Sequence, residues 1–500
     1  MVRLRSPLQG WKQKLAAMNY AYLLAMIGHR LVALAGIVIL SFLLDPAAFG
    51  LYTLSATNAL LTEIVFGQWI AISANKHISI GSGDSGRATI STLGAAMGGY
   101  AALMVVLWLA YVIFPIAHAT PGQVAIVLAW STTLVLYDVT LASKNALGAS
   151  GAYAALALVK NFGSSALSIS LVLLGYGVTG AMAGQIIGTL AAVALLKSSV
   201  RIWRGIRLSL ASRSLALEML KFGVGGTLAL GVYMLFNAIG RNLTGHFLGE
   251  TEAGYLSLAT DLFFGPLTLV GSAYSLSKMP SLYVVEADGD RAQKQAGITD
   301  FIYMNLYFAI PYAVGGAILA PDIAASFLPA ANRAQIAAVS AGAAVQSAAM
   351  LMMCTVTAIL LIFNLRRYLI VATLGTSALN GILLGVAFSL GSSLWQAVWL
   401  STLVLWSAVL LLIFLMVGRR LMRLEAGTIL KITLAAAAMG GAAWACNRLL
   451  LLGQPFGAVI AGLIVYFALT KWMGVTYIQE LVPKRRVKRV DIAATPGQFE

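Results

Sequence analysis

Charged residues are scarce in this sequence of 500 residues, where Asp, Glu, Lys and Arg together make up 10% of the chain. A soluble globular protein carries about 25% charged residues. The chain is 60% hydrophobic and has a mean hydropathy of +0.87. So few charges could not cover a surface that faces water. The composition therefore excludes an ordinary soluble domain and predicts a protein that lipid surrounds.

Cysteine and histidine are rare as well, with two and four residues in the chain. Cys354 and Cys446 both fall within apolar runs, which argues against a disulfide or a metal site. The histidines are scattered, without the spacing of metal ligands. The sequence also lacks the phosphate-binding loop of ATPases and any recognisable nucleophile–base pair. We therefore expect no catalytic residue, metal or cofactor, and a protein that is not an enzyme.

Long apolar runs fill the chain instead. A transmembrane helix needs about 20 apolar residues, and runs of that length recur along the whole sequence. The pattern predicts an all-α polytopic membrane protein with about 14 transmembrane helices. Their expected ranges are 20–44, 49–74, 89–115, 122–143, 150–174, 178–197, 220–245, 252–275, 298–320, 336–362, 368–391, 395–417, 429–450 and 455–475.

Positive charge is distributed unevenly between the gaps that separate these runs. Nearly all of the 33 Lys and Arg residues fall in alternate gaps, whereas Arg333 and Arg448 lie in or near the other gaps. Cytoplasmic loops of membrane proteins carry an excess of Lys and Arg. The pattern therefore predicts that both termini are cytoplasmic. It also explains the net charge of +16 without nucleic acid, which we do not expect as a partner.

A weak internal repeat suggests two halves. The starts of the second and eighth predicted spans, 48–58 and 252–261, both contain a glycine and an aromatic residue followed by small residues. Six spans separate them, so both copies would cross the membrane in the same direction; chance similarity between two helices rich in small residues is the alternative. We expect a cytoplasmic amphipathic N-terminus at 1–19, a first lobe at 20–197, a basic cytoplasmic linker at 198–219, a second lobe at 220–417, two further spans at 418–475 and a basic cytoplasmic tail at 476–500.

Short motifs near these starts resemble those of a known family. They are Leu44-Asp45-Pro46 with Phe49-Gly50-Leu51-Tyr52, Phe247-Leu248-Gly249 with Ala253-Gly254-Tyr255, and Met279-Pro280-Ser281-Leu282 in the expected inner loop after span eight. In these motifs the chain is similar to polysaccharide-export flippases of the Wzx type, which belong to the multidrug/oligosaccharidyl-lipid/polysaccharide exporter superfamily. The arginine-rich first helix of lipid II flippases has no match here. The resemblance implies two six-helix lobes around a central cavity, alternating access, and two extra C-terminal helices compatible with a lipid-linked substrate.

Three basic residues break the charge pattern because they lie inside predicted spans: Arg30, Lys160 and Arg241. A cation at the centre of a transmembrane helix costs about 2.5–3.5 kcal/mol on insertion scales. Such a residue persists where it faces a wet cavity, pairs with an acid or binds an anion. We expect all three to line the central cavity and to bind the sugar and diphosphate of a lipid-linked substrate. Local pairing, or contact of Arg241 with the outer interface, is the alternative.

Three acidic residues also lie inside predicted spans: Glu63, Asp138 and Asp261. A buried carboxyl group can carry a proton, so these residues are candidates for binding a coupling ion, H⁺ or Na⁺. Structural pairing is the stronger expectation for each of them. Glu63 could pair with Arg30 on a neighbouring helix, and Asp261 could pair with Arg241.

The resemblance and the cations together imply a flippase of the cell inner membrane. It would move an undecaprenyl-diphosphate-linked oligosaccharide repeat unit from the cytoplasmic to the periplasmic leaflet, for biosynthesis of lipopolysaccharide O-antigen or exopolysaccharide. Expected partners are that lipid-linked oligosaccharide, membrane lipids and a polysaccharide polymerase. An ion-coupled antiporter for a drug or small molecule of the same superfamily is the main alternative. A membrane-embedded glycan ligase or polymerase fits less well, because the longest outer gap, near 321–335, is short.

Overall fold

The computed structural model describes residues 28, 30–80, 83–114, 119–196, 199, 203–327, 333–449 and 455–475. Within these ranges the chain consists of helices and short connections, and no strand occurs there. The predicted all-α class is therefore confirmed. The predicted N-terminal segment 1–19, the tail 476–500 and part of the predicted linker lie outside the described residues.

The first group of helices comes from the N-terminal part of the chain. It contains the helix Arg30–Leu43, α2 (Pro46–Phe66), α3 (Gln68–Ile80), α4 (Gly83–Ile113), α5 (Pro121–Ala146), α6 (Ser150–Leu171), the π-helical turn η1 (Val172–Tyr176) and α7 (Gly177–Leu195). A short 3-10 turn, η2 (Leu208–Leu210), precedes the second group.

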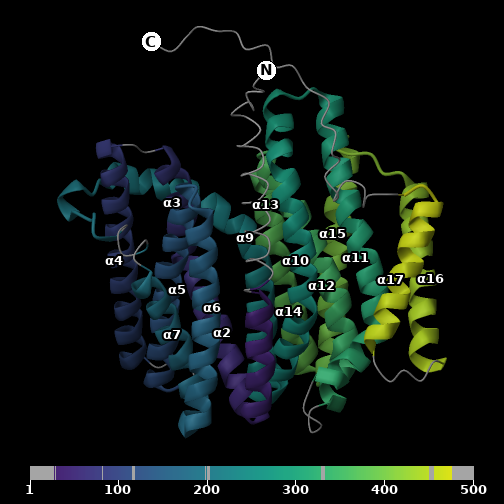
Figure 1. Cartoon of the computed structure of the whole chain (residues 1–500), viewed down its shortest axis with the longest axis horizontal. Helices are drawn as coiled ribbons and strands as arrows, with labels where there is room; N and C mark the ends of the chain where they lie inside the picture. Colours follow the sequence, from purple (N-terminus) through teal and green to yellow (C-terminus); the bar gives the residue numbers. More distant parts are fainter. Residues whose placement is uncertain are drawn as a thin grey trace, which may run out of the picture.

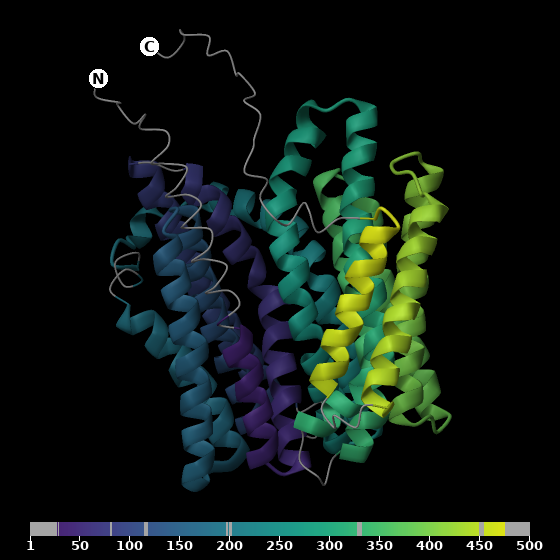
Figure 2. The same ribbon diagram turned by 45° about the vertical axis from the view of Figure 1, so that its right-hand side comes forward.

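The second group begins inside the predicted linker, since α9 starts at Arg213. It contains α9 (Arg213–Phe247), α10 (Glu250–Asp288), α11 (Arg291–Phe327), α12 (Arg333–Ile362), α13 (Arg366–Ile370), η4 (Val371–Gly375), α14 (Thr376–Ser389) and α15 (Leu394–Gly418). Two final helices, α16 (Ala426–Leu449) and α17 (Pro455–Trp472), pack on each other and on α11. They stand side by side at one edge of the molecule (Figures 1 and 2).

Nine helices of the described ranges are long and apolar enough to cross a membrane. The architecture is therefore that of a multi-pass membrane protein, while the number of 14 spans, the domain boundaries and the cytoplasmic position of the termini stay predictions. One detail differs from expectation. The motif at 279–282 lies within α10 and not in a loop, because α10 continues to Asp288. The side chains of Met279, Pro280 and Ser281 lie outside the described residues.

Two glycines make the tight turn between α6 and α7. Gly175 has a φ of 91° and Gly177 a φ of 54°, values that side chains with a Cβ rarely adopt. The helices then run back against each other. Ser168 Oγ donates a hydrogen bond to the Ala181 carbonyl at 2.7 Å, and a Cβ on Gly184 would lie 2.3 Å from the Ser168 nitrogen. Small residues thus allow the hairpin to close tightly.

The two groups form lobes that meet at the ends predicted to face outward. There α2 packs on α10, and the repeat-related Gly50 and Gly254 touch. A Cβ on Gly254 would lie 3.0 Å from Gly50 Cα, and a Cβ on Gly50 would lie 1.8 Å from the Glu250 carbonyl oxygen. Tyr52 and Tyr255 belong to one buried cluster that both lobes share. Glycine is therefore required where the lobes touch.

At the opposite ends, predicted to face the cytoplasm, the two lobes diverge (Figures 1 and 2). In this region α3 packs on α4, α5 and α9, whereas α10 packs on α11. The N-terminal half of α9 joins α3, because Ser73 Oγ donates a hydrogen bond of 2.5 Å to the Met219 carbonyl. Helix α9 thus contacts both lobes, which meet at their outer ends and splay at their inner ends.

Candidate functional site

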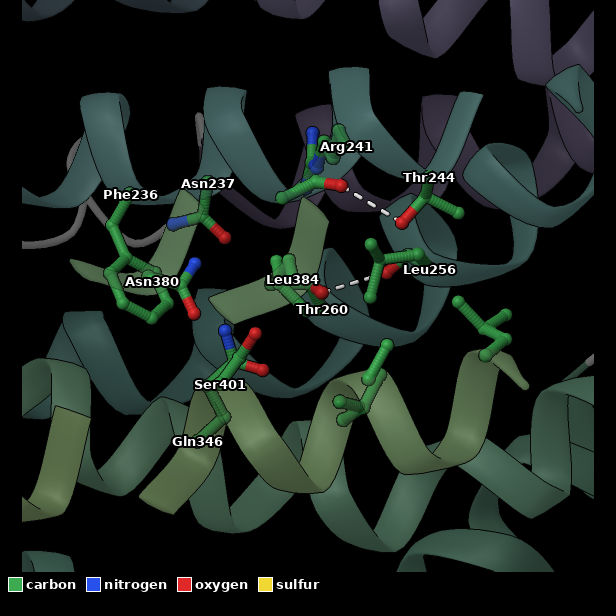
Figure 3. A pocket seen from close by; sticks show the side chains of 14 residues that line it. Phe236, Asn237, Arg241, Thr244, Leu256, Thr260, Gln346, Asn380, Leu384 and Ser401 are labelled. Atoms are coloured by element: carbon green, nitrogen blue, oxygen red, sulfur yellow. Dashed lines mark hydrogen bonds between the residues drawn. The ribbon is translucent and has the colours of Figure 1, made fainter. Parts of the chain in front are cut away.

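A small cavity lies in the outer half of the second lobe (Figure 3). Its lining residues are Phe236, Asn237, Gly240, Arg241 and Thr244 on α9, Leu256 and Thr260 on α10, Gln346 on α12, Asn380 and Leu384 on α14, and Leu394, Ala397, Val398 and Ser401 on α15. The space open to water centres is about 20 Å³, which suffices for about one water molecule. In this conformation the cavity is too small for a sugar diphosphate.

Polar side chains gather on one side of this cavity. The amides of Asn237 and Asn380 lie close together, and Gln346 and Ser401 face them from α12 and α15 (Figure 3). Asn380 is fully buried. Neither atom of its amide, nor Gln346 Oε1, has a hydrogen-bond partner among the described residues. An unpaired buried polar group costs about 1–3 kcal/mol. These amides therefore favour an ordered water or a polar ligand group in the cavity.

Arg241, which lines this cavity, forms hydrogen bonds with residues of both lobes. Its Nη2 donates to Asp261 Oδ1 of α10 at 2.6 Å, and its Nη1 donates to Thr57 Oγ1 of α2 at 3.2 Å. The ion pair is largely buried, with 11% of the Arg241 side chain and 23% of the Asp261 side chain exposed. The neighbouring residues Asn58 and Asn242 exchange amide hydrogen bonds. Two consecutive residues of α9 therefore hold α2 against the second lobe.

A second group of charged side chains lies within the first lobe. Glu63 of α2 and Asp138 of α5 are within hydrogen-bonding reach of each other, and Lys160 of α6 is close enough to Asp138 to interact with it electrostatically. Glu63 is only 2% exposed, whereas Asp138 and Lys160 are half-buried. Lys160 Nζ also donates to Asn161 Oδ1 at 3.3 Å. Glu63 thus lies beside a second carboxyl group, where Arg30 was the expected partner.

The three cations expected in one cavity lie in different surroundings. Arg30 is exposed on the first described helix, and it has no hydrogen-bond or ion-pair partner within the described ranges. Lys160 belongs to the first-lobe group, and of the three only Arg241 lines the second-lobe cavity. A common role in binding a diphosphate therefore stays a prediction for these residues.

Charge alone does not identify all of the polar residues that meet in the lobes. Asn58 and Asn242 join the lobes, and Asn237, Gln346 and Asn380 surround the cavity. An amide inside an apolar span needs a partner much as a charge does, so their presence in predicted spans was an available signal. Which amides meet depends on the packing of helices that are far apart in the sequence.

Comparison with known proteins agrees with this architecture. Residues 17–283 match a family described as "Polysaccharide biosynthesis protein". Among solved structures, the lipid II flippase MurJ in an inward-closed conformation has a TM-score of 0.71 and 16% sequence identity, over 92% of this chain and 99% of that chain. An inward-facing multidrug resistance MATE transporter of the MOP superfamily has a TM-score of 0.61 and 13% identity, over 78% and 94% of the two chains.

A third solved structure is a MOP superfamily transporter from Pyrococcus furiosus, whose binding pocket is described as having reverse polarity. It has a TM-score of 0.54 and 13% identity, over 81% of this chain and 94% of that chain. No curated protein matches the sequence. Identities this low show a shared fold, and the family match spans more than half of the chain. The protein therefore belongs to the polysaccharide biosynthesis protein family, with the fold of MOP superfamily transporters, as its short motifs predicted.

Proposed function

We propose that the protein is a flippase of the cell inner membrane. It moves an undecaprenyl-diphosphate-linked oligosaccharide repeat unit from the cytoplasmic to the periplasmic leaflet, for O-antigen or exopolysaccharide biosynthesis. The family match over residues 17–283 carries this proposal, in a chain built as two helical lobes. Its partners are the lipid-linked oligosaccharide and membrane lipids, and a polysaccharide polymerase uses the product.

The arrangement of the lobes supports transport by alternating access. The outer ends meet at Gly50 and Gly254, while the inner ends diverge (Figure 2), as expected for a carrier that loads from the cytoplasm. Release requires the outer contact to open and the inner ends to approach. Because the cavity inside the second lobe is too small for a sugar, the substrate travels between the lobes.

Positive charge on this route holds the diphosphate. Arg241 lies where α9 meets α2, Lys160 lies in the first lobe, and Arg30 is exposed on the first described helix. A cation that meets a phosphate forms charge-assisted hydrogen bonds, which offset the cost of placing it inside a span. A membrane potential negative inside also favours outward movement of an anion, by about 2.3 kcal/mol per charge per 100 mV.

Polymer export in a strain deleted for the gene tests this function. The wild-type protein should restore export, whereas Arg30→Gln and Lys160→Gln should abolish it without loss of protein from the membrane. Arg333→Gln, in the exposed first turn of α12, is a matched control that should export normally. Normal export by both span variants would refute the cation assignment. Normal export by the deletion strain itself would refute the function.

A second candidate is an ion-coupled antiporter for a drug or small metabolite. The carboxyl pair of Glu63 and Asp138 favours it, because a buried carboxylate can bind a coupling ion. Lys160 and Arg241 count against it for cationic substrates, which they repel. The sensitivity of the deletion strain to a panel of drugs separates the two candidates. Increased sensitivity with intact polymer export supports the antiporter, and the reverse pattern supports the flippase.

A further inference from the structure

We propose that the first lobe binds an anionic phospholipid of the inner leaflet, in a lateral cleft and on the basic segment 203–213 beside it. One acyl chain lies in the cleft, and the phosphate contacts Arg204 and Arg207. The inference goes beyond the proposed transport function and does not depend on the substrate. Three features carry it: the cleft itself, the attachment of the basic segment at its inner end, and the exposed side chains of that segment.

The cleft lies between α4 and α7, which both pack on α5. Its lining residues include Met97, Tyr100 and Ala101 on α4, Thr132, Thr133 and Leu136 on α5, and Leu190 on α7. Its volume is about 250 Å³. A closed apolar cavity of about 150 Å³ holds a benzene molecule. The cleft therefore has room for a stretch of an acyl chain.

The cleft opens toward lipid. Helix α4 stands at the left edge of the first lobe in Figure 1 and is long and apolar enough to cross a membrane. Beyond the cleft, its side chains Val105 and Val106 are exposed, and so is Leu190 on α7. Every lining residue belongs to the first lobe. Exposed apolar side chains on a spanning helix face hydrocarbon, so acyl chains of the bilayer reach the cleft.

The hydroxyl groups in the walls favour an apolar occupant. The hydroxyl of Tyr100 is hydrogen-bonded to that of the buried Ser131. Thr132 and Thr133 donate to carbonyl groups of their own helix, at 2.8 and 2.7 Å. Hydroxyl groups that are satisfied in this way offer little to a sugar or another polar guest. An acyl chain, which needs no hydrogen bond, fits these walls.

The basic segment is attached at the inner end of the cleft. A Cβ on Gly94 of α4 would lie 2.7 Å from Ile206 Cδ1. Gly94 and Ala101 are seven residues apart, so they share one face of α4 and lie about 10 Å apart along its axis. The Arg207 N–H also donates to Ser91 Oγ at 3.1 Å, one turn further inward. Ile206 thus covers the inner end of the helix face that lines the cleft.

The side chains of this segment combine positive charge with apolar surface. Arg204, Arg207 and Arg213 are exposed, and none of their guanidinium groups has an ion-pair partner among the described residues. Leu208 and Leu210 are exposed beside them, Leu208 by 69%. Exposed leucines and cations in one short segment at a membrane boundary are typical of contact with anionic headgroups.

Charge complementarity selects an anionic lipid as the occupant. The guanidinium groups match a phosphate, with which Arg forms paired, charge-assisted hydrogen bonds. A zwitterionic lipid carries its own cation next to the phosphate and gains less from them. The segment directly precedes α9, which contacts both lobes. A lipid bound here therefore ties the connection between the lobes to α4.

Native mass spectrometry of the purified full-length protein tests the site with phosphatidylglycerol and with phosphatidylcholine of the same chains. The wild-type protein should retain phosphatidylglycerol more tightly. Arg204→Gln combined with Arg207→Gln should weaken this binding by about 30-fold, because each Arg or Lys near anionic headgroups contributes about fivefold. Arg291→Gln combined with Arg423→Gln, at two exposed positions of the second lobe, is the matched control that should bind as the wild type.

A second pair of variants tests the cleft. Ala101→Leu should weaken the binding of both lipids, by about fourfold for each methylene group that it displaces from the cleft. Ala102→Leu, at the next and exposed position of α4, should have no effect. In vesicles of phosphatidylcholine, phosphatidylglycerol with a photoreactive group on one acyl chain should crosslink to α4 near Ala101 or to α5 near Leu136.

Four outcomes overturn the proposal. They are equal retention of the two lipids by the wild-type protein, full binding of phosphatidylglycerol by the double arginine variant, crosslinks only outside the cleft, and displacement of the lipid by glycerol phosphate, which would indicate a site for phosphate alone. Thermal melting shows whether Ala101→Leu folds; if it does not, the arginine variants and the crosslinks decide. Polymer export is no part of the test, so its result is independent of the flippase function.

Discussion

Asn58 of α2 and Asn242 of α9 donate to each other across the boundary between the lobes, with Nδ2–Oδ1 distances of 3.1 and 2.8 Å. Asn242 Nδ2 also donates to the Ala238 carbonyl at 2.8 Å. Each side-chain amide is both a donor and an acceptor, so the pair is satisfied only while the lobes touch. This contact holds the outer side closed without a charge.

Asn58→Ala should therefore open the outer side more often. In the closed state this substitution leaves the half-buried Oδ1 of Asn242 without the partner that Asn58 provides. An unpaired polar atom costs about 1–3 kcal/mol, or about 5- to 150-fold in the closed-to-open ratio. Distances between spin labels at Gly122→Cys and Ser389→Cys, in a variant without Cys354 and Cys446, should show a larger population of long distances.

The control for this experiment is a second amide pair within the first lobe. Asn145 donates to Asn75 at 3.2 Å on an exposed surface, so Asn145→Ala should leave the label distances unchanged. Equal distance distributions in the Asn58→Ala and wild-type proteins would contradict a role of the cross-lobe pair in closure.

Gly50→Ala should block the same closure by steric overlap. The new Cβ would lie 1.8 Å from the Glu250 carbonyl oxygen, and backbone atoms cannot move aside as a flexible side chain can. We expect long label distances and loss of polymer export from a protein that still reaches the membrane. Gly98→Ala, at a position with no atom within 4 Å of the new Cβ, should behave as the wild type. Full export by Gly50→Ala would show that the glycine contact is dispensable.

Substitutions of Arg241 and Asp261 should have coupled, non-additive effects on the stability of the protein. Removing one partner of a buried pair costs about 3–5 kcal/mol, and we expect about 2–4 kcal/mol here because a part of Asp261 is exposed. The double variant Arg241→Gln with Asp261→Asn should lose less than the sum of the single changes. Thermal unfolding in detergent measures the stability of the two single variants and of the double variant. Additive losses would mean that the two side chains do not stabilise each other.

In the hairpin of α6 and α7, a methyl group should be destabilising where the two helices touch and harmless where there is open space. Gly184→Ala places a Cβ 2.3 Å from the Ser168 nitrogen and should destabilise the protein by about 1–3 kcal/mol. Gly163→Ala, on α6 with open space around the new Cβ, should be neutral or stabilising by up to about 1 kcal/mol. The difference between their melting temperatures checks the prediction, and equal values would contradict the close approach.

The sequence predicted an element boundary well where the residues at that boundary themselves determine the backbone conformation. Gly175 and Gly177 mark the turn between α6 and α7 because only a residue without a Cβ adopts their φ values readily. Extension of α10 to Asp288 was missed, because residues beyond the apolar run no longer resemble a span although they remain helical. The start of α9 at Arg213, inside the predicted linker, has the same cause.

The candidate sites were predicted less completely. Arg241 and Asp261 are 20 positions apart on adjacent helices, so their pairing was within reach of sequence reasoning. The approach of Glu63 to Asp138, in place of Arg30, depends on how α2 packs on α5. A list of intramembrane charges names the residues that need a partner, yet it does not say which partner each one meets.

Composition and the spacing of apolar runs by themselves determined that this chain is an all-helical membrane protein, because backbone groups in lipid must satisfy one another within each segment. They also identified the costly charges and the similar starts of two spans, each of which contains one glycine and an aromatic residue. Only the tertiary structure decided that Gly50 and Gly254 touch, that Asn58 reaches Asn242 and that the carboxyl groups of Glu63 and Asp138 lie near each other in the first lobe. These contacts join residues that are 75 to about 200 positions apart, and which helices meet is set by side-chain packing between them, which no single helix encodes.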